Sequence, residues 1–183
     1  MKKYLTLAAL AAIAGGVVRH TMAGRSAFTT VLLAPSRTSL PGQLEWDHVV
    51  RGEDEIVEYA EKLIEELNGT STGGRYAFFI DSLTDFTGTA AEDPLDRLIR
   101  AAVRSDQFVV GEGESSTWGQ AWALAKSFRA ARRGLVLVPG EMDADQLTGT
   151  SVGRFRVADF PPGRGFLIGG GTAAKVQVAL GGI

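Results

Sequence analysis

Two acidic residues follow apolar segments of the chain and are the side chains best placed to do chemistry. Asp81 comes directly after the apolar run at residues 76–80, and Glu112 follows the run at 108–110 and one glycine. Both runs predict buried strands, and ligands of parallel sheets bind at the carboxyl ends of the strands. There Asp81 meets solvent, and Glu112 can orient a water molecule or pair with a basic residue. A capping or loop role accounts for the same positions, so both interpretations stay open.

A third candidate is the turn Phe160-Pro161-Pro162-Gly163-Arg164-Gly165. Two prolines fix the direction of the chain, and two glycines let the backbone approach a ligand closely, with one arginine between them. An ordinary turn leading into a hairpin is the alternative.

The composition excludes several kinds of site. The 183 residues contain no cysteine and two histidines, which rules out disulfides and thiolate ligands and argues against a histidine-rich metal centre. The 19 Lys+Arg and 21 Asp+Glu give a net charge of −2, which argues against a generally basic nucleic-acid coat protein. The length suits one domain over residues 1–183.

Apolar runs and amphipathic stretches alternate along the chain and predict the elements that hold these residues. We expect strands at 29–34, 76–80, 108–110 and 135–138, helices at 53–68, from Asp93 onward and at 118–128, and a closing hairpin at 165–168 and 176–179. Trp118 and Trp122 are expected in the core. Strands separated by helices predict an α/β fold with a mostly parallel sheet, helices on both of its faces and a carboxyl-terminal β-hairpin.

The amino-terminal segment at residues 1–23 fits two descriptions. Two lysines, an apolar run at 4–14 and the triplet Thr21-Met22-Ala23 resemble a secretory signal, and the run is too short to span a bilayer. The same residues also predict a core helix. Its apolar stripe would consist of Leu7, Leu10, Ala14 and Val17 or Val18.

Several segments together resemble the carboxyl-terminal two-thirds of an FtsK/SpoIIIE-type ATPase domain, most closely the actinobacterial versions that include the type VII secretion ATPases. The similarity covers roughly residues 28–180. The matching segments are residues 31–37, 78–81, 109–118, 133–139 with Asp143 and Asp145, 160–168 and 176–179.

This resemblance implies a RecA-like P-loop fold, a three-layer α/β sandwich, and ring-forming cytoplasmic oligomers that use ATP and Mg²⁺ to move DNA or secreted protein. Asp81 would be the Walker B aspartate that binds Mg²⁺. Glu112 is a second catalytic candidate because of its place at a strand end, not because of the resemblance. The turn Pro162-Gly163-Arg164-Gly165 would lie beside the nucleotide base. Residues 1–23 would match the helix after the phosphate loop, which favours a helix over a signal peptide.

The chain departs from the family pattern in one important respect, because it contains no GxxxxGK[ST] phosphate loop. In this loop the glycine amides bind the phosphates, the lysine neutralises them, and the hydroxyl holds Mg²⁺. Ser82 and Glu112 also lie at positions where the FtsK/SpoIIIE-type proteins that act as motors commonly carry other residues. We therefore expect weak nucleotide binding and no efficient hydrolysis, either because the chain is a fragment or because the module is degenerate. A non-catalytic module that binds a partner ATPase or a peptide is the main alternative, and a secreted α/β domain is a third.

Overall fold

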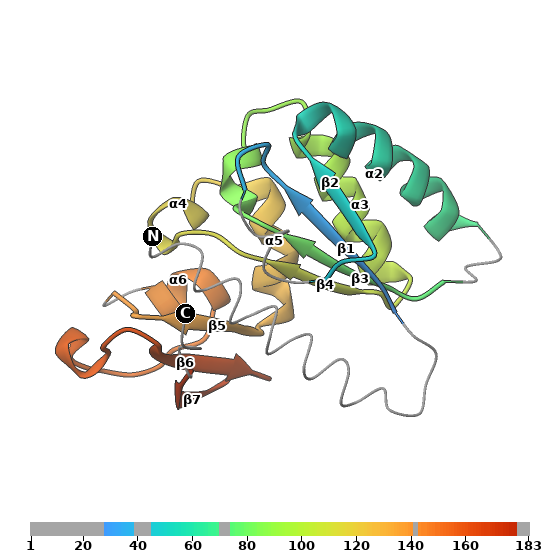
Figure 1. Cartoon of the computed structure of the whole chain (residues 1–183). Coiled ribbons are helices and arrows are strands. Elements are labelled where there is room, and N and C mark those ends of the chain that lie inside the picture. The colour runs from blue at the N-terminus through green and yellow to red at the C-terminus, as the bar shows by residue number, and fades with distance from the viewer. Residues whose placement is uncertain (1–27, 39–44, 70–73, 141–142, 179–183) are drawn as a thin grey trace.

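The computed structural model describes residues 28–38, 45–69, 74–140 and 143–178. Residues 28–112 form a first lobe around a parallel sheet of four strands in the order β2-β1-β3-β4 (Figure 1). These strands are β1 (Thr29–Ala34), β2 (His48–Arg51), β3 (Tyr76–Ile80) and β4 (Phe108–Gly111). The central strands β1 and β3 lack charged residues and are buried along most of their length, as strands covered on both faces are.

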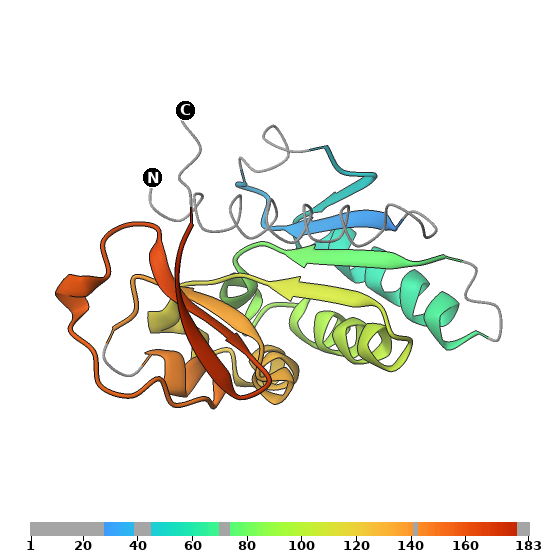
Figure 2. The same cartoon turned by 90° about the horizontal axis from the view of Figure 1, so that it is seen from below.

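Two long helices cover one face of this sheet, α2 (Glu53–Asn68) and α3 (Glu92–Arg104) (Figure 2). Their apolar stripes pack against alternate residues of the strands, such as Leu33 and Phe78, because side chains alternate between the faces of a sheet. A short turn of 3₁₀ helix, η2 (Leu83–Phe86), follows β3 and leads toward α3. Helix α2 has three acidic residues in its own first turn, and their charges stabilise its amino terminus.

Residues 134–178 form a second lobe around an antiparallel sheet in the order β5-β6-β7. Its elements are β5 (Gly134–Leu137), α6 (Asp143–Thr148), η3 (Val157–Asp159), β6 (Arg164–Gly169) and β7 (Thr172–Gln177). Gly170 and Gly171 close the β6–β7 hairpin with φ angles of 59° and 81°, which glycine adopts without strain.

Two helices connect the lobes, α4 (Ser115–Trp118) and α5 (Trp122–Ala131). Helix α5 contacts α3 in the first lobe and α6 in the second. The lobes are therefore joined on the side of the sheet that the helices occupy (Figure 2).

The predicted α/β fold class is confirmed, as are the carboxyl-terminal hairpin and the predicted strands. Strand ends shift by at most one residue, except in the second strand of the hairpin, which was predicted at 176–179 and lies at Thr172–Gln177. Helices were expected on both faces of the parallel sheet, but the described helices α2, α3 and α5 pack on one of them. The strands form two sheets, because β4 and β5 do not pair with each other in the described part of the chain. The helix predicted from Asp93 onward begins one residue earlier, at Glu92, and Ala91 holds the cap position. The helix predicted at 118–128 is two helices. The placement of Trp122 in the core was wrong, because its side chain is 64% exposed.

The predictions made for residues 1–23 lie outside the described residues. Within the described ranges, no helix has the length and apolar character that crossing a membrane requires.

Candidate functional site

Asp81 lies at the carboxyl end of β3 and is only 3% exposed. Its backbone N–H donates to the Leu33 carbonyl at 2.9 Å, which continues the β1–β3 pairing by one residue. Its carboxylate accepts hydrogen bonds from the Thr38 hydroxyl at 2.7 Å and the Ser82 hydroxyl at 3.2 Å. In the described part of the chain no basic side chain pairs with this carboxylate, and both of its side-chain partners are neutral hydroxyl groups.

Glu112 lies at the carboxyl end of the adjacent strand β4 and is 6% exposed. Its carboxylate accepts the backbone N–H of Ser82 at 3.2 Å. Its own backbone is also fixed, because its N–H donates to the Ile80 carbonyl at 3.0 Å and its carbonyl accepts the Leu83 N–H at 2.7 Å. The structure therefore brings Asp81 and Glu112 together at one edge of the sheet.

Ser82 connects the two carboxylates, through its hydroxyl to Asp81 and its N–H to Glu112. Its backbone is left-handed, with φ 49° and ψ 50°, a conformation that costs a non-glycine residue about 1–2 kcal/mol. Both hydrogen bonds hold the residue in this conformation. The sequence predicted neither this role of Ser82 nor the hydrogen bond from Thr38.

The donor set at this edge fits Mg²⁺ only in part. Carboxylate and hydroxyl oxygens are ligands that Mg²⁺ prefers, and Mg²⁺ commonly takes one or two carboxylates together with water or substrate phosphates. No group of three or more His, Asp or Glu side chains that could hold a metal occurs among the described residues. Phosphate oxygens or water would therefore have to complete the coordination of Mg²⁺ at Asp81.

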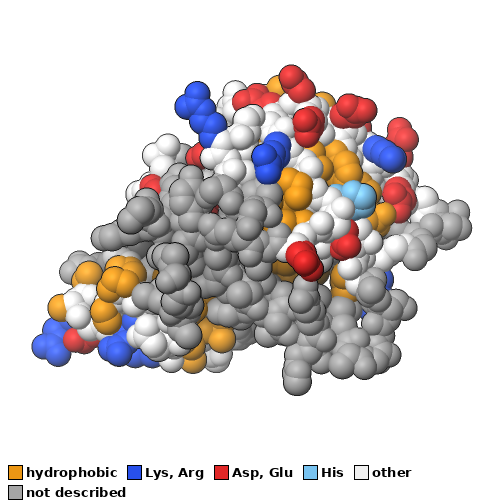
Figure 3. All heavy atoms as spheres, viewed as in Figure 1, with side chains coloured by type: hydrophobic (Ala, Val, Ile, Leu, Met, Phe, Trp, Pro, Cys, Tyr) orange, Lys and Arg blue, Asp and Glu red, His pale blue; other side chains and the backbone are white. Residues whose placement is uncertain are grey.

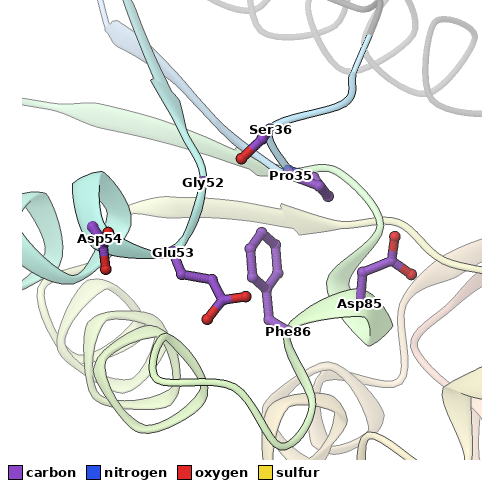
Figure 4. Close-up of a pocket in the computed structure, with 7 residues that line it drawn as sticks. All are labelled: Pro35, Ser36, Gly52, Glu53, Asp54, Asp85 and Phe86. Carbon is purple, nitrogen blue, oxygen red and sulfur yellow. The ribbon is translucent and has the colours of Figure 1, made fainter.

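A pocket of about 310 Å³ opens at the same edge of the sheet (Figure 4). It is enclosed by the residues that follow β1, by the start of α2 and by η2, which comes directly after Asp81 and Ser82. Its lining consists of Pro35, Ser36, Gly52, Glu53, Asp54, Asp85 and Phe86. Three of these seven residues are acidic, so the pocket repels a free polyphosphate. No pattern in the sequence predicts this pocket, because its lining comes from three separate segments.

The turn at Pro162-Gly163-Arg164-Gly165 belongs to the second lobe, at the start of β6. The guanidinium of Arg164 donates to the Asp159 carbonyl at 3.1 Å and to the Gln177 side chain at 3.3 Å. Gln177 in turn donates to the Pro162 carbonyl at 3.4 Å. The polar contacts of Arg164 therefore stay within its own lobe, and no described contact joins them to Asp81 or Glu112.

The local structure explains why both residues of this turn, Gly163 and Gly165, are glycine. Gly163 has a φ of 84°, a conformation that favours glycine. A Cβ at Gly165 would collide with the carbonyl oxygen of Val136 on β5, so this glycine permits the close pairing of β5 and β6. These requirements hold whether or not a ligand binds beside the turn.

Shifted pKa values occur at the opposite, amino-terminal edge of the parallel sheet. Backbone and side-chain hydrogen bonds from Thr30 lower the pKa of Asp47. Burial, together with the hydrogen bond to Glu66, raises the pKa of Tyr76 to about 12.

Acidic side chains gather over helix α2, on the upper part of the view in Figure 3. The helix carries seven acidic residues and one lysine. One of the seven, Glu61, pairs with Arg97 of α3 at 2.7 Å. This surface repels nucleic-acid phosphates at neutral pH.

No known protein family and no curated protein matches the sequence. Two solved structures match the fold. The chain aligns with EssC (ATPases 2 and 3) from Geobacillus thermodenitrificans at a TM-score of 0.66 and 15% identity, over 98% of this chain and 35% of that one. It shares the fold of this ATPase structure. The cytoplasmic domain of EssC aligns at a TM-score of 0.65 and 14% identity, over 98% of this chain and 38% of that chain.

The chain thus spans little more than a third of the EssC chains that it matches. The match confirms the predicted RecA-like α/β fold, with its parallel sheet and separate antiparallel sheet.

Proposed function

We propose that this chain is an FtsK/SpoIIIE-type ATPase module related to type VII secretion, with little or no ATP hydrolysis of its own. The observation that carries the proposal is the pair of buried carboxylates, Asp81 and Glu112, connected through Ser82 at adjacent strand ends of an EssC-like fold. Ligands of such sheets bind at this edge.

In this proposal Asp81 contributes an oxygen ligand to Mg²⁺ and Glu112 orients a water molecule or holds Ser82 in place. ATP supplies phosphate oxygens to the ion when it is bound. Pro162-Gly163-Arg164-Gly165 lies beside the nucleotide base, as the family resemblance implies. The sequence lacks the glycine-rich loop that grips phosphates, and the pocket beside Asp81 is acidic. Both features support weak nucleotide binding.

The surface charge favours a protein over DNA as the partner. The net charge is −2, and α2 carries seven acidic residues, so an approaching duplex would be repelled on that side. We propose assembly with other ATPase modules in the cytoplasm and action on secreted protein.

The test is a titration of the full chain with a fluorescent ATP analogue, with and without Mg²⁺. We expect millimolar or weaker binding that Mg²⁺ strengthens, and we expect Asp81→Asn to remove the Mg²⁺-dependent part. Asp106→Asn is the matched control, because Asp106 is an exposed aspartate just before β4, at the opposite edge of the sheet, and does not line the pocket. Micromolar binding would contradict the proposed degeneracy. Equal effects of the two substitutions would contradict the role of Asp81.

The acidic pocket supports a second function, a non-catalytic module that binds a basic peptide of a partner ATPase or substrate. Glu53, Asp54 and Asp85 attract a lysine or arginine, and Pro35 offers apolar contact to its aliphatic part. A lysine-rich peptide that binds with strong salt dependence, while a glutamine-substituted peptide does not bind, would favour this function. Equal binding of both peptides would exclude it.

A further inference from the structure

Charge is distributed unevenly over the three helices that pack on one face of the parallel sheet. Helix α2 carries seven acidic residues and one lysine. Helix α3, which contacts both α2 and α5, carries three acidic residues and three arginines. The segment at residues 119–140, which contains α5, carries four basic residues and no acidic one. A negative and a positive helix therefore lie on either side of a neutral one (Figure 1).

The negative surface is a row along α2, here called the acidic row, which consists of Asp54, Glu58, Glu61 and Glu65. Their spacings of four, three and four residues place them on one side of the helix. Glu61 pairs with Arg97 of α3. The other three are exposed and form no ion pair within the described part of the chain. Like charges at this spacing repel one another, so the row favours an approaching cation.

The positive surface, here called the basic patch, consists of Trp122, Lys126 and Arg129 of α5 and of Arg133 just beyond its end. Trp122 is 64% exposed, and the guanidinium of Arg129 lies over its ring, 5.3 Å from the ring centroid. Lys126 and Arg133 are exposed, and among the described residues none of the three cations forms an ion pair. Tryptophan and arginine are the residues that most often carry the binding energy of protein interfaces.

Helix α3 differs from both surfaces because its charges are largely paired. Arg97 lies 3.7 Å from Asp93, and Arg100 lies 2.6 Å from Asp96, so one turn of the helix neutralises the next. The acidic row and the basic patch have no such neutralisation within the described residues. Each of them offers the charge that the other lacks.

We propose that the acidic row of one copy of this chain binds the basic patch of a second copy. The opposite charges steer the two surfaces together and fix their register, and the contact covers the exposed ring of Trp122. Each copy carries both surfaces, so identical chains suffice to form the contact. This inference rests on the proposed assembly of ATPase modules and names the surfaces that form it.

Charge-swapped variants of the full chain test the pairing by sedimentation velocity at low ionic strength. Glu58→Lys with Glu65→Lys makes the acidic row basic, and Lys126→Glu with Arg133→Glu makes the basic patch acidic. We expect the parent chain to self-associate, and each double variant alone to do so at least about tenfold more weakly. An equal mixture of the two double variants should regain the association of the parent, because opposite charges then face each other again.

Arg154→Glu with Arg156→Glu is the matched control, because it changes the net charge as Lys126→Glu with Arg133→Glu does, at exposed residues of the second lobe. This control should associate like the parent. Raising the salt concentration from about 50 to about 500 mM should dissociate the parent, since salt screens exposed charges.

Three results would each overturn the proposal. They are a parent chain that stays monomeric at low ionic strength, charge-swapped variants that associate as strongly as the parent, and a mixture that does not regain association. None of these readouts involves nucleotide, so they can fail while the proposed weak binding of ATP at Asp81 holds, and the reverse.

Discussion

The two lobes are stabilised in different ways. The first lobe buries both faces of its parallel sheet and packs two long helices against one of them. The second lobe has a small core around Val136 and Ile168, closed by Phe155, Phe160 and Phe166 with ring centroids 4.8–5.3 Å apart. Aromatic packing of this kind concentrates the stabilisation in a few side chains. The first lobe therefore supplies a rigid frame for Asp81 and Glu112, whereas the geometry of the second lobe depends on single residues.

The largest expected effect comes from removing one core phenylalanine from each lobe. Phe78 is 1% exposed in the main core and Phe166 is 4% exposed in the small one. We expect Phe78→Ala to lower the free energy of unfolding by about 3–5 kcal/mol and to speed amide exchange throughout the chain. Phe166→Ala should speed exchange in β5, β6 and β7 while β1 and β3 stay protected. Equal loss of protection in both lobes after Phe166→Ala would show that the lobes unfold as one unit.

A smaller effect is expected from the close approach of β5 and β6. Gly165→Ala forces a Cβ against the Val136 carbonyl and should cost about 1–3 kcal/mol, confined to the second lobe. Gly169→Ala is the matched control in the same strand, because no atom lies within 4 Å of the added Cβ. Its effect should stay within about 0.5 kcal/mol in denaturant titrations. If the two variants are equally stable, the strand pairing is looser than described.

Ser82 allows a measurement of backbone strain at the functional edge of the first lobe. Ser82→Ala and Ser82→Gly both remove the hydrogen bond to Asp81, but only glycine adopts a φ of 49° without strain. We expect the glycine variant to be more stable than the alanine variant by about 1 kcal/mol in chemical denaturation. An alanine variant as stable as the glycine variant would mean that position 82 relaxes to an ordinary conformation.

The smallest expected effect is a pH dependence at the β1–β2 edge. The hydrogen bonds from Thr30 lower the pKa of Asp47 in the folded chain, so the unfolded chain binds the proton more tightly. The contribution of Asp47 to folding stability is therefore present above the unfolded pKa of about 3.9. It is lost as the pH falls through the lower pKa of the folded chain. Between pH 5 and 3 the Tm of the parent should fall more steeply than that of Asp47→Asn. Glu45→Gln is the control at a neighbouring exposed carboxyl group, and its profile should follow the parent. A steeper profile for Asp47→Asn would refute the assignment.

Much of the first lobe was predictable because its central strands carry a strong and simple signal. The apolar runs at 29–34 and 76–80 are bounded by polar or turn residues, and long helices separate most of the strands. The short strand β2 was missed. It has four residues, three of them exposed, and its pattern does not differ from that of a polar loop. Trp122 was misplaced because the helix breaks after Trp118, which changes the side of the helix that faces the core.

The candidate site was predictable only where a residue ends a strand. Asp81 and Glu112 follow apolar runs, so their common edge can be inferred from parallel pairing alone. The contribution of Thr38 depends on a contact across 43 positions, and that of Ser82 depends on a left-handed backbone. Neither has a pattern in the sequence. Whether Arg164 acts together with Asp81 stays a prediction.

The outer strands of the two sheets differ in how they are protected. Among the described residues β7 pairs only with β6, and it carries Lys175 in the middle of an exposed strand, which discourages another chain from adding to it. β4 pairs only with β3 in the described part of the chain, and its residues Phe108-Val109-Val110-Gly111 include neither a charge nor a proline. Bare backbone donors and acceptors of this kind promote self-association as protein concentration rises. A dimer found only in concentrated samples would therefore have a simple origin at this strand, and its dissociation on dilution should be checked before a biological assembly is inferred.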